Sequence, residues 1–407
     1  MNKVGVGTNK ESGQVSILTV IIFILLFSVL VISFSRVMVM ASRQTVNDEL
    51  AASAKAAAEA GIEDAKRILS YCVSGGLGCG MLDKPIEEST CTEISGTSSL
   101  MHALQRTASG SSVKVGDGGN NEEYLCLKMT MMTPDYLGSL DSNGSAEGRS
   151  TSVIIPLRFS SADGTSVPAK TIRLQWHSTS RDDEGSAELL AGNNLPPINQ
   201  WGKMTPAVLR AEFVAVPIGT FTIDNLVENT RAVTLRPSTT EDAFGAGKIS
   251  DAYNLDSWIA KNQPNAATDS KMFLMQVRCQ SGVSSDGYAC SISFTIPKVP
   301  GSGGTNYLFD TDRYDYYLRL QAIYRNAHFR LSAKDASGND LYLNNVQAAV
   351  DVTGRAGESL KRLGARLNPD NSSDEGQWWP DYAVDSAGKI CKNMTILDKA
   401  GADNCRD

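Results

Sequence analysis

The chain has 407 residues, of which 42% are hydrophobic and 20% are charged, and its formal net charge is −7. The negative charge and the lack of any basic run exclude a surface built mainly to bind nucleic acid, whose phosphates require clustered lysine and arginine. The chain is long enough for an N-terminal anchor followed by one large or two ordinary domains with hydrophobic cores.

A hydrophilic leader opens the chain. Residues 1–13 end in Ser12 and Gly13, and an uncharged, mostly apolar run follows over residues 15–32, with no charge until Arg36. A helix of about 18 residues is near the lower limit for crossing a bilayer. A cleaved secretory signal starts in a similar way, but its apolar core is usually shorter and ends in an A-x-A-like pattern. The run therefore predicts a transmembrane helix, and a cleaved signal is the less favoured alternative.

An amphipathic pattern continues beyond the apolar run. Small or apolar residues recur there at the three- and four-residue steps of one helix face: Leu50, Ala54, Ala58, Ile62, Ala65 and Leu69. We expect one continuous helix over residues 14–70, roughly 80 Å long. Its second half should pack this face, here called the stalk stripe, on a β-rich body or on a neighbouring subunit. A simple membrane tether would need no such stripe outside the membrane.

This start resembles the type IV pilin superfamily, and within it the PilX-type minor pilins. The family combines a short leader ending in glycine, an apolar half-helix and an amphipathic half-helix. The matching parts here are Gly13-Gln14, the apolar run and the segment AAEAGIEDA at residues 57–65. The resemblance implies cleavage between Gly13 and Gln14 by a prepilin peptidase. Leu18 stands at the fifth mature position, where many major pilins carry an acid, which implies a minor subunit.

Eight cysteines lie outside the membrane run and the stalk: Cys72, Cys79, Cys91, Cys126, Cys279, Cys290, Cys391 and Cys405. Cys279 and Cys290 flank a turn-rich connection between two alternating runs, so we expect a β-hairpin with these cysteines facing each other and joined. Cys391 and Cys405 are a second candidate pair, and the first four cysteines keep three possible pairings. The spacings do not favour zinc. Disulfides would indicate an oxidising, extracytoplasmic environment.

Alternating apolar residues predict mainly antiparallel β-structure beyond the helix, and hence an α+β fold. Residues 153–159 and 172–176 predict a hairpin around Asp163-Gly164. Residues 353–367 could form a strand or a short helix. Further strands are expected at 208–216, 273–279, 290–296, 316–324, 329–333 and 346–352.

The β-rich region offers one weak division, near Asn194 and the following prolines. It separates a first part at residues 71–194 from a second part at residues 195–367. The tail over residues 368–407 is polar except for Trp378-Trp379, which we expect to anchor it to the body, with an exposed binding patch as the alternative.

Signals for catalysis are weak. His102, His177 and His328 are scattered, and no nucleophile-elbow, zinc-protease or phosphate-loop motif is present. The acidic segment 310–315 lacks the glycine and terminal glutamate of a calcium loop, although an irregular calcium site stays open. We expect no enzymatic activity, no cofactor and no resident metal.

The sequence therefore predicts a minor pilin-like subunit with a single membrane span, an extracytoplasmic β-rich region and, after assembly, a place in an extracellular filament. Its expected partners are other pilin subunits, the pilus assembly machinery, prepilin peptidase, the membrane and a surface or host ligand. Two alternatives remain: a single-pass tethered adhesin that keeps its leader, and a membrane-anchored hydrolase with converging carboxylates.

Overall fold

The computed structural model has the predicted α+β architecture, in which one long N-terminal helix precedes mainly antiparallel β-structure. The structure describes residues 12–115, 122–140, 152–178, 201, 205–219, 230–238, 253–254, 274–279, 287–295 and 314–369. The expectations for the leader before residue 12, for Asp310 and Asp312 of the acidic segment, for Trp378-Trp379 and for the Cys391–Cys405 pair lie outside these residues.

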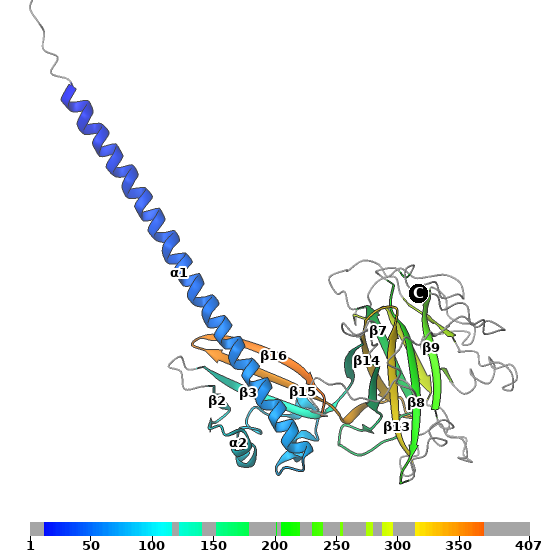
Figure 1. The fold of residues 1–407 in the computed structure, drawn as a ribbon. Helices are drawn as coiled ribbons and strands as arrows, with labels where there is room; N and C mark the ends of the chain where they lie inside the picture. Colours follow the sequence, from blue (N-terminus) through cyan, green and yellow to red (C-terminus); the bar gives the residue numbers. More distant parts are fainter. Residues whose placement is uncertain are drawn as a thin grey trace, which may run out of the picture.

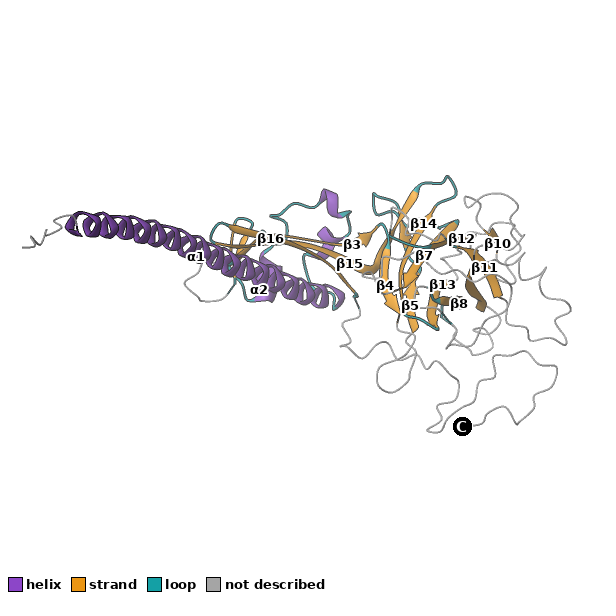
Figure 2. Ribbon diagram, turned by 90° about the horizontal axis from the view of Figure 1, so that it is seen from above, coloured by secondary structure: helices purple, strands orange, loops and turns teal. Residues whose placement is uncertain are grey.

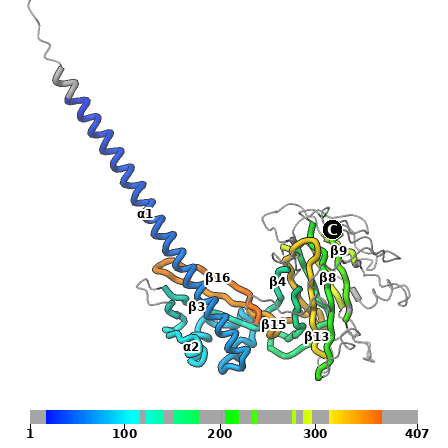
Figure 3. The backbone as a smooth tube through the Cα atoms, viewed as in Figure 1, coloured from blue at the N-terminus to red at the C-terminus, as the bar shows by residue number. Residues whose placement is uncertain are grey.

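Helix α1 spans Ser12–Val73 without a break, so the apolar run and the stalk form one helix. Its 62 residues give a length of about 90 Å, and its N-terminal half projects away from the rest of the molecule (Figures 1 and 3). The helix ends in a Schellman motif at Gly75, whose φ is 84°. The amides of Gly75 and Gly76 donate to the carbonyl oxygens of Cys72 and Tyr71, each at 3.0 Å.

The second half of α1 packs on an antiparallel sheet built from two distant parts of the chain (Figures 1 and 2). We call this assembly the helix-bearing unit. Its strands, in spatial order, are β1 (Ala108–Ser109), β2 (Ser112–Lys114), β3 (Glu123–Thr133), β15 (Asp340–Ala356) and β16 (Ser359–Leu367). The short helices η1 (Cys79–Leu82), η2 (Ile86–Glu88) and α2 (Ser98–Leu104) lie between α1 and β1 in the chain.

Between β3 and β15 the chain forms a β-sandwich, here called the insert, from residues 134–339 (Figure 1). One layer contains β4 (Tyr136–Leu140), β7 (Thr171–Ser178), β10 (Tyr253–Asn254), β12 (Cys290–Thr295) and β14 (Ala327–Lys334). The other layer contains β5 (Ser152–Pro156), β8 (Val208–Pro217), β9 (Thr230–Ser238), β11 (Leu274–Arg278) and β13 (Tyr314–Ile323). Trp176, Phe213, Phe294 and Phe329 are buried between the layers.

Strand β15 contributes residues to two hydrophobic cores and connects them. Its first part pairs with β14 and with β6 (Phe159–Ser160), and Leu341 and Leu343 belong to the core of the insert. Its second part pairs with β3 and β16, and Val350 and Val352 belong to the core under α1. The helix-bearing unit and the insert therefore have separate hydrophobic cores, and one continuous sheet contributes to both.

The predicted hairpin of residues 153–159 and 172–176 is wrong. Strand β5 pairs with β13 in the five-stranded sheet, whereas β7 pairs with β12 and β14 in the larger sheet. The alternation of apolar residues indicates that one face of each run is buried, but it does not determine which strand the run pairs with. Both runs bury their apolar face in the same core, although they lie in different sheets.

The hairpin expected around Cys279 and Cys290 is also corrected. Strand β11 pairs with β9 in one layer and β12 pairs with β7 in the other, so the two cysteines meet through a single isolated bridge. The remaining strand predictions match β8, β11, β12, β13, β14 and β15, and residues 353–367 continue β15 and form β16. Both sheets contain strands from before and after residue 194.

Candidate functional site

The first half of α1 presents an apolar surface on all sides. Large side chains from Ile17 to Met40 are about half to four-fifths exposed, and Phe27, for example, is 70% exposed. The helix is long and apolar enough to cross a membrane, and none of its most apolar stretch is buried against the rest of the chain. This half of α1 is a candidate membrane anchor.

The second half of α1 buries the stalk stripe on the sheet. Ala54, Ala58 and Ala65 are 0% exposed and Leu69 is 2% exposed, while Leu50 and Ile62 are half-buried at its margins. The stripe therefore packs on the molecule's own sheet. Four further helix residues are buried beside it: Ala57, Gly61, Asp64 and Ile68.

Small residues let the backbone of α1 approach the sheet closely. A Cβ atom on Gly61 would lie 2.5 Å from Cγ2 of Val352 and 3.3 Å from the ring of Tyr124. From the sheet side, a Cβ atom on Gly354 would overlap the carbonyl oxygen of Ala54. The alanine-rich composition of the stalk thus has a packing reason, because larger side chains would hold the helix away from the sheet.

A buried carboxylate fixes the helix on this surface. Asp64 is 1% exposed, and its Oδ2 accepts hydrogen bonds from the Tyr124 hydroxyl at 3.1 Å and from Nε of Arg106 at 3.2 Å. Its Oδ1 lies 3.4 Å from a guanidinium nitrogen of Arg67. Burial, and then the Asp64 charge, raise the pKa of Tyr124, so the phenol stays protonated and continues to donate. This network links α1 to β3 and to the segment after α2.

Asp64 was not predicted from the sequence. Its position in the stalk pattern, three residues after Gly61 and one before Ala65, was the available signal, since it places a carboxylate on the buried helix face. A buried carboxylate needs charged or hydrogen-bonding partners. Those partners, Tyr124 and Arg106, lie far away in the sequence and could not be paired with Asp64 from spacing.

Three disulfides lie among the described residues: Cys72–Cys79, Cys91–Cys126 and Cys279–Cys290. The first two select one of the three pairings that the sequence left open. The third is the predicted pair, although it joins the two layers of the insert instead of closing a hairpin within one sheet.

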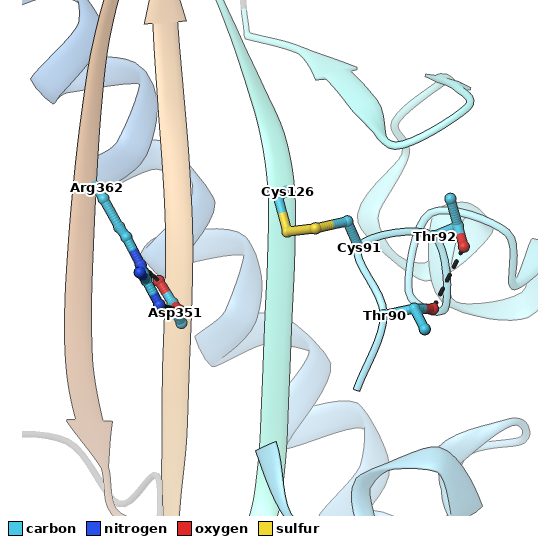
Figure 4. The surroundings of a disulfide bond; sticks show 6 residues. All are labelled: Thr90, Cys91, Thr92, Cys126, Asp351 and Arg362. Carbon is cyan, nitrogen blue, oxygen red and sulfur yellow. Dashed lines mark hydrogen bonds and ion pairs between the residues drawn. A yellow bond between two sulfur atoms is a disulfide. The ribbon is translucent and has the colours of Figure 1, made fainter. Parts of the chain in front are cut away.

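The Cys91–Cys126 disulfide ties the segment between η2 and α2 to β3 (Figure 4). In the same view, Arg362 of β16 forms an ion pair with Asp351 of β15. The disulfide therefore attaches this segment covalently to the sheet on which α1 packs.

The predicted processing site lies at the start of α1, where Gly13 and Gln14 are helical. Cleavage between them stays a prediction. The three histidines lie in two places: His177 and His328 are cross-strand neighbours whose ring centroids lie 5.3 Å apart, and His102 lies on α2. Within the described stretches, no three His, Cys, Asp or Glu residues are grouped to hold a metal ion.

Comparisons with known proteins add no assignment to this geometry. No protein-family model matches the chain, and no curated protein matches it significantly.

Proposed function

We propose that the protein is a minor subunit of a type IV pilus or a related filament, held in the membrane by α1 before assembly. The observation that supports this proposal most strongly is the division of α1 into an exposed apolar half and a half buried on its own sheet. The exposed half continues past Arg36 with five further apolar side chains: Val37, Met38, Val39, Met40 and Val46.

The exposed part of α1 is longer than a bilayer requires. A hydrocarbon core of about 30 Å covers about 20 helical residues, whereas residues 17–49 of α1 precede the packed stripe and extend about 50 Å. A single bilayer would leave the segment beyond Arg36 partly uncovered. Neighbouring helices in a filament would cover it, and apolar packing would replace lipid contacts at little net cost.

The size of the insert is relevant to where such a subunit would lie in a filament. Residues 134–339 add a second core beyond the helix-bearing unit, and this bulk would crowd a repeating shaft. We therefore favour a tip or low-copy position, with the insert on the outside as the part available for adhesion. The three disulfides of the described residues support an extracytoplasmic location, because disulfides form and persist in oxidising environments.

The test is made in the producing cell, with the parent chain, Gly13→Leu and Val39→Asp. The parent should lose its leader and occur in the sheared filament fraction. Gly13→Leu should keep the leader and stay in the membrane. Val39→Asp should be processed and remain in the membrane, yet be depleted about tenfold or more from filaments, because a charge would be buried among packed helices.

Lys55→Gln is the matched control for Val39→Asp, since Lys55 lies on the exposed face of the packed half of α1. It should assemble as the parent does. An intact Met1 leader on surface protein, together with the absence of the parent from filaments, would contradict the proposal. That result would support the single-pass tethered adhesin instead.

A further inference from the structure

The joint between the helix-bearing unit and the insert lies along β15, which is flanked there by the end of β3 and, at Tyr342 and Leu343, by β6. At this point β3 ends and β15 crosses from one core to the other. The pairing register of β3 and β15 shifts between Asn344 and Ala349, and Asn345 has a φ of 57°. A bulge of this kind interrupts the β3–β15 ladder and bends the strand, so the pairing of these two strands is weakened at the joint.

Asp135 forms an ionic bridge across the joint. Its side chain is 8% exposed; Oδ1 lies 2.8 Å from a guanidinium nitrogen of Arg366, and Oδ2 lies 2.7 Å from Nε of Arg330. Arg366 also donates to the backbone carbonyl of Asp135 at 3.3 Å. Arg366 belongs to β16 of the helix-bearing unit, whereas Arg330 belongs to β14 of the insert. One carboxylate thus connects an arginine from each side.

Gln347 makes a second link at the bulge. It is 3% exposed, its Oε1 accepts from the amide of Leu137 at 3.1 Å, and its Nε2 donates to the carbonyl oxygen of Leu137 at 2.9 Å. The side chain of one β15 residue therefore satisfies both backbone groups of a β4 residue, as a neighbouring strand would do.

We propose that the joint is a hinge locked by the Asp135 bridge and the Gln347 amide, which together fix the angle between α1 and the insert. Each core has its own buried residues and its own disulfide, so loss of the lock should free the angle while both cores stay folded. The lock determines how the insert is presented relative to the membrane or filament axis. It does not depend on which assembly the protein joins.

The Asp135 bridge is suited to this role because its carboxylate is removed from water. A buried carboxylate that loses a partner is left partly unpaired, which makes opening costly. The Asp351–Arg362 pair offers a contrast: it is also an aspartate–arginine pair that uses β16, but both residues lie within the helix-bearing unit and Arg362 is 74% exposed. Removing that pair should not affect the joint.

The test is hydrogen–deuterium exchange of the full chain in detergent, comparing the parent with Arg366→Gln and the matched control Arg362→Gln. Arg366→Gln keeps the Asp135–Arg330 contact inside the insert. Peptides covering residues 134–138 and 344–348 should exchange roughly tenfold faster than in the parent, because an opening equilibrium shifts by about that factor when a charge-assisted hydrogen bond is lost. Peptides from β7 and from residues 123–130 of β3 should be unchanged.

Gln347→Leu supplies an independent variant and should accelerate the same two peptides. Arg362→Gln should leave them at the parent rate. The proposal would be overturned if Arg366→Gln changed no peptide at the joint, or if it accelerated β16 and β3 throughout, as a general loss of stability would do.

Discussion

Gly354 of β15 lies so close to Ala58 of α1 that a Cβ atom on Gly354 would stand 2.5 Å from the Ala58 backbone nitrogen and 3.0 Å from its Cβ atom. The contact is made by backbone on both sides. It explains why the stalk is rich in alanine and why glycine occupies a strand position directly beneath the helix, where it would otherwise weaken the strand.

Gly354→Ala should therefore destabilise the helix-bearing unit, by about 1–3 kcal/mol, because the backbone of α1 has to move to admit the methyl group. Chemical denaturation followed by circular dichroism measures this loss. Gly364→Ala is the control, since Gly364 lies in the adjacent strand and its nearest neighbour, the carbonyl oxygen of Val350, would be 3.8 Å from the added Cβ atom. Equal stability of the two variants would refute the close-packing account.

Ile68→Ala should cost about 2–5 kcal/mol, the usual range for emptying a fully buried aliphatic site. Ile68 is 0% exposed in the core under α1, whereas Ile62 only packs against the margin of that core. Ile62→Ala should accordingly cost less. The comparison is made in one denaturation series, and a larger loss for Ile62→Ala than for Ile68→Ala would contradict this order of burial.

The exposed apolar half of α1 and the stalk stripe could be predicted because each is encoded by residues close together in the sequence. An uncharged run and a three- or four-residue repeat each define a helix surface within one segment. The repeat did not distinguish packing on the molecule's own sheet from packing on a neighbouring subunit. That choice depends on β3, β15 and β16, which are far from α1 in the sequence.

The two longest strands that the sequence analysis missed, β3 and β9, are covered on both faces along part of their length. Met131, Met132 and Thr133 at the end of β3 are consecutive buried residues, and so are residues 233–238 of β9. Alternation disappears when polar and apolar residues are buried alike on both faces. The sequence also could not predict which strand each expected strand pairs with, because a period-two pattern specifies a buried face and not a neighbouring strand.

Stability should fall as the pH rises above about 10, the pKa of an unfolded tyrosine. Burial and the charge of Asp64 raise the pKa of Tyr124, and burial raises the pKa of Tyr136 to about 12. Above pH 10 the unfolded chain loses these protons while the folded chain keeps them, so unfolding becomes more favourable with pH. Each tyrosine should contribute a slope of about 1.4 kcal/mol per pH unit until its folded pKa is reached.

Tyr124→Phe should reduce this alkaline slope by the contribution of one tyrosine, and it should also lower stability near neutral pH because Asp64 loses a hydrogen-bond donor. Denaturant midpoints measured from pH 8 to pH 11 give both effects. If the slope were the same in parent and variant, the Tyr124 phenol would not be the titrating group.

The Cys279–Cys290 disulfide should stabilise the insert by holding its two layers together at β11 and β12. The cysteines are 11 residues apart in the chain, and closing a loop of this size is worth about 2–3 kcal/mol in the chain-entropy model. Replacing both residues by alanine should lower the stability of the insert by that amount. The Cys72–Cys79 double alanine variant serves as the control, because that disulfide lies at the end of α1 and its removal should leave the stability of the insert unchanged.

Peptide mapping of the parent under non-reducing conditions should recover the Cys279–Cys290 pair, and free thiols at both positions in exported protein would contradict the pairing.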